Sequence, residues 1–564
     1  MNPRRLLIPI LAAVLFTAAA KKSTTTSAVP SEVRSAMKMF RAEAMKAHVA
    51  FLASDLLEGR GPGTRGDQLT QQYIASQFAA AGLQPAGDKG TYFQKVSLLG
   101  MATIPESTSV SFVKDGATIG PLKHLDDFVG TDQTQSEKNA LGSDVIFVGH
   151  GVEAPEYKWD DYKGIDTKGK TLVMIASDPP ATATEPDLFK GKARTYYGRW
   201  TYKFEIGTVK NAEGVILIHT DDTAGYGWSV VRNSWGGERS YVRNEPGQPA
   251  LRFAGWMTQK VAADLFKAAG HDLGAMMKAA ASRDFKPVPL GAKFTGNIAT
   301  KIRPFDTANV LAKVAGSDPK LRDQAIVYSG HHDHLGIGKA DESGDNIYNG
   351  AVDNGTGVAL LIEMGRVWAQ SGAKPKRSVI FAAVAAEEQG LLGSEFLGLN
   401  PPVPAGRLAL NLNFDAILQI GRVKDVQMVG AERTTFYPTA ERVTKALGLR
   451  IVPDTAPEQG FYYRSDHFSL AKVGVPAFSI DAGSEVIGKP ADFGKKKEDE
   501  YRAKHYHQPG DELRADWDWS TAVQMAELGY WLGWEAANGT AMPAWKPGDE
   551  FEAARAKSLA ALKR

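Results

Sequence analysis

From Asn309 onward the chain alternates short apolar runs with stretches of helical spacing, and no other feature constrains its fold as much. These runs and stretches cover residues 326–329, 358–368, 378–386, 392–399, 408–414 and 476–480. Alternation of this kind predicts a largely parallel sheet with helices on both faces. Because sites in such sheets form beyond the carboxyl ends of the strands, chemistry is expected at those ends.

Five segments near these strand ends carry imidazole and carboxylate side chains. They are Ser329–Gly336, the glycine-rich turn Asn349–Gly357, Glu387–Glu388, Asn411–Asp415 and His505–Asp511. Taken singly, each is typical of a solvated or helix-capping residue, but their joint occurrence at one sheet edge indicates a shared site. Carboxylates that converge in a cleft repel one another, and each unpaired buried charge costs several kcal/mol unless a cation is present.

Composition narrows the chemistry of such a site. The 564-residue chain contains no cysteine, which excludes a disulfide, a thiolate zinc ligand and a thiol nucleophile. Imidazole and carboxylate ligands suit Zn²⁺, and one Asp can bridge two ions about 3.5 Å apart. The chain has 66 Lys and Arg against 64 Asp and Glu and no basic block, so nucleic acid is not expected as a partner.

The motifs also have a characteristic order. They are His-x-Asp at 331–333, Gly-Ala-x-Asp-Asn-x-x-Gly at 350–357, Glu387-Glu388, Asp415 after Asn-x-Asn-Phe, and Tyr506-His507. This order resembles that of the co-catalytic zinc exopeptidases, which include secreted bacterial aminopeptidases, glutamate carboxypeptidase and, as a relative, glutaminyl cyclase. The resemblance covers about 45–125 and 300–540. It implies an α/β fold with a mostly parallel mixed sheet flanked by helices, of the phosphorylase/hydrolase-like type, and a peptide substrate.

The resemblance implies two zinc ions per chain and a ligand set for each. One ion would be held by His331, Asp353 and Asp415, and the other by Glu388, His507 and the same bridging Asp353. Asp333 would orient His331 through its other ring nitrogen. Val352 stands where many members have a second Asp, but that position is not a ligand, so the metal site is not put in doubt.

Catalytic roles are implied by the same resemblance. Glu387 would be the general base, which takes a proton from the attacking water and passes it to the leaving amine. Tyr506 resembles a position whose phenol helps to hold the tetrahedral oxyanion, with Tyr462 and Tyr463 as rivals. Adjacent residues at a strand end point in different directions, so Glu387 and Glu388 can divide the work between base and ligand.

The other histidines are expected outside the metal shell. On an extended strand end, His332 and His334 point to the face opposite His331 and Asp333. His467 is interpreted as structural or substrate-lining, and His505 is the alternative to His507 as the last ligand.

Two loop regions are interpreted separately. The loop Gly59–Gly66 lacks the Gly-Lys-Ser/Thr ending of a P-loop and follows no buried strand, so it is interpreted as an ordinary structural loop. The helix that follows it is expected to stop at Gly82. Loop 461–465, with Tyr463 and Arg464 as substrate-binding candidates, and the lysine-rich segment 483–501 are candidates for the pocket and its rim.

The length of the chain favours two or more domains. Residues 1–20 have an Arg4-Arg5 start, an apolar stretch and a small-residue end, which is typical of a secretory signal peptide. The protein is therefore expected to be exported, periplasmic or extracellular, without a membrane span after signal removal. The other expected units are a linker and N-terminal segment at 21–44, a zinc peptidase domain at 45–129 and 296–545, and a C-terminal surface helix at 546–564. The β-rich segment 130–295, with Phe147–Gly151, resembles the protease-associated domain that the family carries as an insert.

The leading functional hypothesis is a secreted aminopeptidase that acts on a free N-terminus. A carboxypeptidase, in which Arg464 holds the C-terminal carboxylate of the substrate, is the second. Glutaminyl cyclisation needs one zinc, and the full two-metal ligand set argues against it. A non-catalytic binding relative would show degraded ligands, whereas this chain has every expected ligand and the base. The motifs specify neither a side-chain preference nor an oligomeric state.

Overall fold

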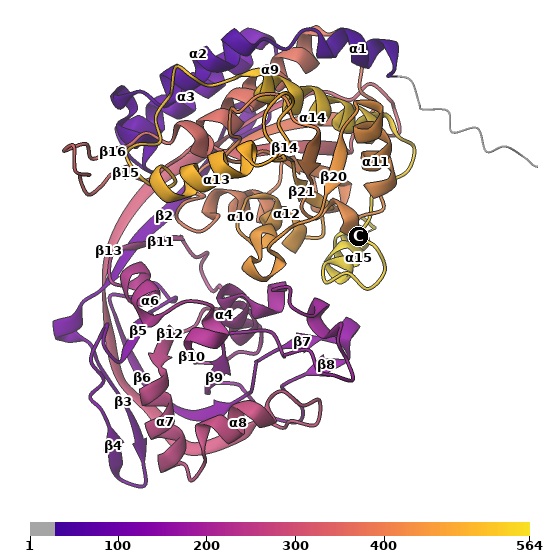
Figure 1. Cartoon of the computed structure of the whole chain (residues 1–564). Coiled ribbons are helices and arrows are strands. Elements are labelled where there is room, and N and C mark those ends of the chain that lie inside the picture. The colour runs from indigo at the N-terminus through magenta and orange to yellow at the C-terminus, as the bar shows by residue number, and fades with distance from the viewer. Residues whose placement is uncertain (1–28, 564) are drawn as a thin grey trace, which may run out of the picture.

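The computed structural model describes residues 29–563, and these form two lobes (Figure 1). The predicted signal peptide at 1–20 lies outside the described residues. Within 29–563, no helix has the length and apolar character that crossing a membrane requires.

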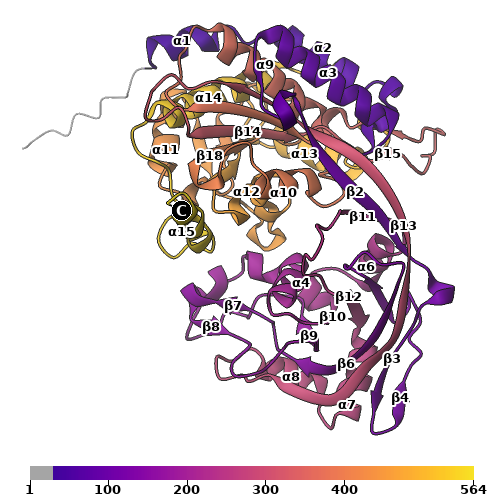
Figure 2. The same ribbon diagram turned by 180° about the vertical axis from the view of Figure 1, so that it is seen from behind.

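One long strand belongs to both lobes. Residues 288–299 of β13 (Val288–Val314) pair antiparallel with β6 (Lys138–Phe147) in the second lobe. Residues 310–314 of the same strand pair antiparallel with β17 (Ser378–Val384) in the first lobe. Strand β2 (Phe93–Thr103) accompanies β13 between the lobes, from Phe93 opposite Val310 to Thr103 opposite Thr300. Figure 2 shows these two antiparallel strands as the connection between the lobes.

The sheet of the first lobe is mixed and mostly parallel. Its order is β21 (Ala477–Ser479), β18 (Leu408–Asn413), β14 (Ala325–His331), β17 and β13. The first four strands are parallel to one another, and β13 is antiparallel to β17. Strands β14 and β18 are buried along their whole length, as strands covered on both faces must be. The predicted fold class is confirmed.

Helices cover both faces of this sheet because alternate strand residues point to opposite sides. Ile326 and Phe381 pack in one core with four helices, α2 (Ala42–Leu52), α3 (Arg65–Ala81), α9 (Gly357–Gln370) and α14 (Ser520–Asn538). Their neighbours Val327 and Ile380 pack on the other face with α10 (Leu392–Leu399) and α12 (His467–Lys472). Helix α3 ends at Gly82, whose φ of 88° places it in the left-handed region, as predicted.

Part of the segment 21–44 contributes to this core. Helix α1 (Ser31–Met37) buries Val33 and Ala36 completely. These two apolar side chains are at helical spacing and pack in the same hydrophobic core as residues of α14. At the other end of the chain, α15 (Glu552–Ala561) is mostly exposed, although Arg555 is buried and donates to the carbonyl of Ala405 at 3.1 Å.

The second lobe is an α/β unit and not only β-rich. Its parallel strands are β6, β9 (Thr171–Ile175), β10 (Gly214–His219) and β12 (Phe253–Thr258), and β5 (Phe128–Thr131) is an antiparallel edge. Helices α4 (Trp200–Val209) and α6 (Trp228–Trp235) pack on one face, and α7 (Gln259–Ala268) and α8 (Leu273–Ala279) on the other. Its likeness to a protease-associated domain stays a prediction.

The boundary of this lobe lies earlier in the chain than residue 130. Strand β3 (Ser109–Lys114) pairs with β13 residues 293–297, and β4 (Ala117–Ile119) pairs with β3. Residues 109–119 therefore extend the sheet of the second lobe, because their strands pair with β13 and with each other there.

The remaining elements are β1 (Gln84–Pro85), β7 (Glu153–Ala154), β8 (Trp159–Asp160), α5 (Asp221–Ala224), β11 (Arg239–Val242), β15 (Gly336–Ile337), β16 (Ile347–Tyr348), β19 (Asp425–Gln427), α11 (Tyr437–Ala446), β20 (Arg450–Val452), β22 (Asp481–Ala482) and α13 (Phe493–Lys504).

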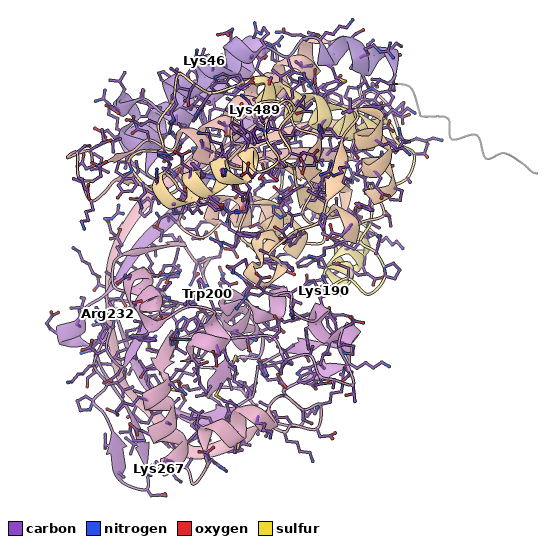
Figure 3. All side chains as sticks on the ribbon, in the orientation of Figure 1. Lys46, Lys190, Trp200, Arg232, Lys267 and Lys489 are labelled. Carbon is purple, nitrogen blue, oxygen red and sulfur yellow. The ribbon has the colours of Figure 1, made fainter. Side chains whose placement is uncertain are left out.

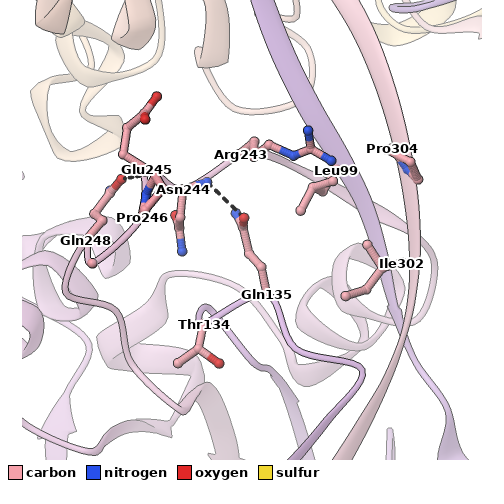
Figure 4. Close-up of a pocket in the computed structure, with 11 residues that line it drawn as sticks. Leu99, Thr134, Gln135, Arg243, Asn244, Glu245, Pro246, Gln248, Ile302 and Pro304 are labelled. Carbon is pink, nitrogen blue, oxygen red and sulfur yellow. Dashed lines mark hydrogen bonds between the residues drawn. The ribbon is translucent and has the colours of Figure 1, made fainter.

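A polar hollow lies beside the connecting strands, lined by Leu99 of β2, Ile302 of β13 and the loop 243–248 (Figure 4). The backbone N–H of Asn244 donates to Gln135 Oε1 at 2.9 Å and holds the loop in place. The lining contains amides, the guanidinium of Arg243 and the carboxylate of Glu245 but no imidazole. The chemistry expected at the strand ends therefore lies elsewhere.

Candidate metal centre

The carboxyl ends of three neighbouring parallel strands bring the predicted ligands together. His331 is the last residue of β14 and lies opposite Val384, the last residue of β17, after which the chain reaches Glu387 and Glu388. Strand β18 ends at Asn413, opposite Ser329 of β14, and leads to Asp415. Because the strands run in parallel and in register, these side chains meet at one edge of the sheet.

Asp353 and His507 reach the same edge from loops. Asp353 lies in the turn that leads into α9, where Gly350 has a φ of 58°. A Cβ on Gly350 would lie 2.3 Å from the carbonyl oxygen of Asp353 and 2.6 Å from the ring of His334, so only glycine fits there. His507 follows α13 and is half-exposed, whereas Asp353 is buried.

The donor atoms form two groups that share Asp353. In the first, Nε2 of His331 lies 3.2 Å from Asp353 Oδ1 and 3.2 Å from Asp415 Oδ1. In the second, Nε2 of His507 lies 3.3 Å from Asp353 Oδ2 and 3.1 Å from Glu388 Oε2. Zinc bonds of about 2.0–2.1 Å in a tetrahedron place neighbouring ligand atoms about 3.3 Å apart. Both groups fit a zinc ion, and each oxygen of Asp353 faces one of them.

The carboxylates of the cluster are stabilised in their ionised, negatively charged form. Burial disfavours the ionised form of Asp353, but hydrogen bonds with His331 and His507 outweigh burial and hold its pKa well below the usual range. Burial and Asp353 likewise oppose ionisation of Glu388, yet hydrogen bonds with His334 and His507 lower its pKa to about 2. Desolvation works against a charged His507, but Asp353 and Glu388 raise its pKa to about 10. Such stabilised carboxylates are the state that a divalent cation requires of its ligands.

Glu387 differs from its neighbour Glu388. One oxygen of Glu387 lies within 4.8 Å of ligand atoms of His331 and Glu388, but Glu387 belongs to neither zinc-type group described above. Burial, followed by repulsion from Glu388 and Asp415 against the attraction of His331, raises its pKa well above the usual range. A carboxylate with raised proton affinity beside a cation site is suited to accept a proton.

His334 turns toward the cluster, so the expectation that it points to the face opposite His331 is wrong. Its Nδ1 lies 2.6 Å from Glu388 Oε1, and Glu388 can therefore use its other oxygen toward a metal ion. The strand alternation that predicted the opposite orientation stops at His331, where β14 ends. His332, still at the strand edge, does point away, and its Nε2 lies 3.1 Å from the carbonyl of Ala308.

Asp333 supports the site in a different way from the one predicted. Its carboxylate lies 3.8 Å from Nδ1 of His331, while its main-chain carbonyl is nearer, at 3.2 Å. The carboxylate instead accepts from the backbone N–H groups of Glu387 at 3.0 Å and Glu388 at 3.3 Å. Burial raises the pKa of Asp333 to about 8. Asp333 therefore fixes the backbone that carries both glutamates, and its carbonyl orients His331.

Three supporting residues had no role assigned to them by the sequence interpretation. Asp511 accepts from the backbone N–H groups of Val352 at 3.0 Å and Asp353 at 3.1 Å, and Ser465 donates to Asp415 Oδ2 at 2.6 Å. Arg60, in the loop interpreted as an ordinary one, is 1% exposed. Its guanidinium donates to the carbonyls of His332 at 2.9 Å and Gly350 at 2.9 Å, and also to those of Leu52 and Asn349. Arg60 thus ties the His331 loop to the Asp353 loop, and its only local signal was its place in a glycine-rich run.

The tyrosine and arginine candidates divide between the site and its surroundings. Tyr506 lies at the cluster, with its ring stacked on His507 at a centroid distance of 3.9 Å. Tyr463 does not reach the cluster, because it is buried and donates its hydroxyl to Glu550 at 2.6 Å. The hydroxyl of Tyr462 is bound to the carbonyl of Ala477 at 3.1 Å. Arg464 is exposed and lies over the ring of Phe461, next to Ser465.

The other two histidines lie outside both groups. His505 directs Nδ1 to the carbonyl of Gly510 at 2.8 Å and Nε2 toward Arg514, so it does not replace His507. His467 is buried against the ring of Tyr462, and burial lowers its pKa to about 3, which keeps it neutral.

Residues 309–530 match the model of "Peptidase family M28", and this range contains His331, Asp353, Glu387, Glu388, Asp415 and His507. The residues of the metal centre thus lie in a region that is similar to peptidase family M28. Arg60 and the second lobe lie outside the matched M28 region.

Individual relatives match shorter stretches. A "Probable zinc metalloprotease" of Pyrenophora teres f. teres is 34% identical over 125 residues, which are 22% of this chain and 26% of the relative. "Leupeptin-inactivating enzyme 1" of Streptomyces exfoliatus is 26% identical over 247 residues, 43% of this chain and 51% of the relative. The chain thus spans from about a quarter to a half of these curated relatives. The solved aminopeptidase from Aneurinibacillus sp. strain AM-1 is 17% identical, with a TM-score of 0.44, over 92% of this chain and 98% of that one.

Proposed function

We propose that this protein is a zinc-dependent exopeptidase with two zinc ions per chain, and that it acts as an aminopeptidase. The observation that carries the proposal is the position of Asp353, whose two oxygens face two separate groups of ligand atoms. The match of residues 309–530 to a peptidase family supports hydrolysis of peptide bonds as the reaction. Bound zinc would supply Lewis acidity toward the scissile carbonyl and a lower pKa for water.

The residues of this chain perform the proton transfers and hold the geometry. Glu387 accepts a proton from the attacking water and returns it to the leaving amine. Asp333 holds the backbone of Glu387 and Glu388 so that the base and the ligand face different partners. The phenol of Tyr506, beside His507, is the candidate to donate to the oxygen that becomes negative during attack.

The aminopeptidase form of the proposal rests on the motifs and on the acidic surroundings of the centre. Asp466 and Asp481 add to the carboxylates of the site, and burial, with Asp415 among the further contributions, raises the pKa of each to about 7. A substrate ammonium would be favoured among such groups, because an adjacent cation stabilises their ionised form. The sequence feature at 1–20 supports export of the enzyme to the periplasm or the medium.

Carboxypeptidase activity is the second candidate, and the exposed Arg464 next to Ser465 favours it. Hydrolysis of dipeptides blocked at one end or the other separates the two. Cleavage only when the N-terminus is free supports the aminopeptidase, and cleavage only when the C-terminus is free overturns it in favour of the carboxypeptidase. Conversion of N-terminal glutamine peptides to a cyclic product without hydrolysis would overturn both.

A further inference from the structure

The segment between α14 and α15 touches both lobes. Residues 539–551, here called the C-terminal segment, lie outside the region matched by the family model, which ends at residue 530. The segment is tied to the first lobe, where the backbone N–H of Thr435 donates to the carbonyl of Ala544 at 2.8 Å. Near its end it carries Glu550, whose side chain is only 2% exposed. A carboxylate buried to this extent needs hydrogen-bond partners, and those of Glu550 come from both lobes.

The partners of Glu550 belong to separate parts of the chain. Its Oε1 accepts from the hydroxyl of Tyr463 at 2.6 Å and from the guanidinium of Arg433 at 2.6 Å. Its Oε2 accepts from the backbone N–H of Tyr196 in the second lobe at 3.1 Å. Nζ of Lys190 lies 3.8 Å from Oε1, on the side of the second lobe that faces the first (Figure 3). One carboxylate therefore joins the second lobe to the loop 461–465.

Aromatic packing holds these partners in place. Phe551, the residue after Glu550, is buried, and its ring centroid lies 6.1 Å from that of Tyr196 and 6.1 Å from that of Phe468. The ring of Tyr463 packs edge-on against Phe468 at 5.4 Å and stacks on Tyr196 at 6.5 Å. These rings come from the C-terminal segment and from both lobes. The contact between Glu550 and the Tyr463 hydroxyl is thus fixed from several sides.

The loop that Glu550 holds leads directly to the metal centre. Tyr463 ends the turn Phe461–Tyr463, and Ser465 follows two residues later. The hydroxyl of Ser465 donates to Asp415 Oδ2 at 2.6 Å and accepts from Asn413 Nδ2 at 2.8 Å. This hydrogen bond leaves Oδ1 of Asp415 to face His331. The position of the Ser465 hydroxyl therefore depends on where the turn before it is held.

We propose that Glu550 is a positioning residue, which fixes the loop 461–465 against the second lobe and, through Ser465, orients the ligand Asp415. This inference rests on the proposed two-zinc function and deepens it, because it gives a residue outside the matched region a part in holding one of the two ions. Groups that orient a metal ligand contribute to metal affinity. In the other zinc-type group, Glu388 is oriented by His334, so the effect is expected at one ion only.

The test measures the two zinc dissociation constants of the full-length protein by competition with a chelator. Ser465→Ala identifies the ion held by Asp415, whose affinity should fall by about 10–100-fold. Glu550→Gln keeps the size of the side chain but removes its charge and one acceptor oxygen. It should weaken the same ion by about tenfold, the lower end of that range, because it acts at one remove. The affinity of the other ion should stay within about twofold of wild type in both variants.

Asp549→Asn is the matched control. Asp549 also pairs with Arg433, at 2.8 Å, and its side chain is 6% exposed, but its hydrogen bonds in the described chain reach neither Tyr463 nor the second lobe. Both zinc affinities should stay at the wild-type level. The double variant Ser465→Ala/Glu550→Gln should bind zinc no more weakly than Ser465→Ala alone, because the effect of Glu550 passes through Ser465. A general loss of structure would instead add to the loss from Ser465→Ala.

Equal zinc affinities in Glu550→Gln and Asp549→Asn, or additive losses in the double variant, would overturn the inference. If Glu550→Gln does not fold, Tyr463→Phe takes its place, since it removes only the hydroxyl that Glu550 accepts from. It should weaken the same ion, and an unchanged affinity would overturn the inference. A wild-type protein that binds one zinc or none would overturn the proposed two-zinc centre and this inference with it. Failure of the inference alone would show only in the variants, with two ions bound to the wild type.

Discussion

Both lobes place polar residues at the carboxyl ends of parallel strands, but only one of the two sets has the form of a metal centre. In the first lobe, His331, Glu388 and Asp415 follow β14, β17 and β18. In the second, His150 and Asp178 follow β6 and β9. The two sheets thus offer the same kind of location to chemically similar side chains.

The difference lies in the partners of these side chains. In the second lobe, the buried amino group of Lys203 donates to the carbonyls of His150 at 2.7 Å and Ser177 at 3.1 Å, and burial lowers its pKa to about 7. Asp178 accepts from the backbone N–H of Thr195 at 3.1 Å. In the first lobe, carboxylates and imidazoles turn their donor atoms toward one another instead. Polar residues at strand ends are therefore not enough to predict a site, and an excess of converging acceptors is the informative feature.

The largest expected effect separates the base from the ligands within the first-lobe cluster. Glu387→Gln removes the proton acceptor and should lower kcat by about 10³-fold, within the usual range for general-base catalysis. Zinc content should stay at the wild-type level, because Glu387 belongs to neither zinc-type group described above. Hydrolysis of an aminoacyl-arylamide and metal analysis of the same sample measure both quantities.

The matched variant is Glu388→Gln, which should lose zinc together with activity because Glu388 Oε2 faces His507. Near wild-type hydrolysis by Glu387→Gln would remove that residue from the role of base. Loss of zinc by Glu387→Gln would make it a ligand.

The next effect concerns the support of the cluster by Arg60. Arg60→Met leaves carbonyls of the two ligand loops without their donor, so zinc affinity should fall by about 10–100-fold. Arg377→Met is the control, since Arg377 is also buried and also donates to main-chain carbonyls, such as that of Ala536 at 2.9 Å. Competition with a chelator measures the affinity. Equal zinc affinity in Arg60→Met and Arg377→Met would show that Arg60 supports only the fold.

A change to Lys203 in the second lobe should lower the stability of the protein and leave catalysis unaffected. Lys203→Met leaves two buried carbonyls without a donor, which should lower the free energy of unfolding by about 2 kcal/mol. The kcat of the folded variant should stay within about twofold of wild type, because Lys203 contacts no ligand residue. Denaturant unfolding and kcat at a permissive temperature test the two parts. A lower kcat with an unchanged free energy of unfolding would contradict the purely structural role of Lys203.

The smallest effect is a pH dependence of stability from His150. Burial, then the charge of Lys203, lower the pKa of His150 to about 3, below the usual 6.5. His150 is therefore protonated in the unfolded chain at a pH where it stays neutral in the folded chain. The free energy of unfolding falls as the pH drops below 6.5. Between pH 7 and pH 5.5 the loss should be about 1 kcal/mol. The difference between wild-type and His150→Asn unfolding profiles isolates this contribution, and parallel profiles would contradict it.

Much of the first lobe could be predicted from local patterns. Apolar runs such as 326–329 and 378–386 fall on β14 and β17, and the helix ending at Gly82 is α3. Motif order picked out His331, Asp353, Glu388, Asp415 and His507, and the structure brings these five side chains together. The strands could be predicted because their periodicity is a local property of the sequence. The ligands could be predicted because few sites other than metal centres combine histidine, aspartate and glutamate in this order.

The features that were missed depend on geometry that a local pattern does not carry. His334 joins the cluster because the chain leaves strand conformation after His331. Arg60 acts on carbonyls 272 and 290 residues away, so its loop could not be distinguished from an ordinary one. Tyr463 was a reasonable pocket candidate by position, but Glu550, far along the chain, holds its hydroxyl.

Under the proposed function Asp353 would be shared by two zinc ions, and the zinc content of dialysed protein tests this most directly. The wild-type chain should retain two zinc ions, because each oxygen of Asp353 faces its own group of ligands. Asp353→Asn should retain fewer than two, since an amide offers only one oxygen. A wild-type chain that retains one zinc or none, or an Asp353→Asn variant that retains two, would contradict the account.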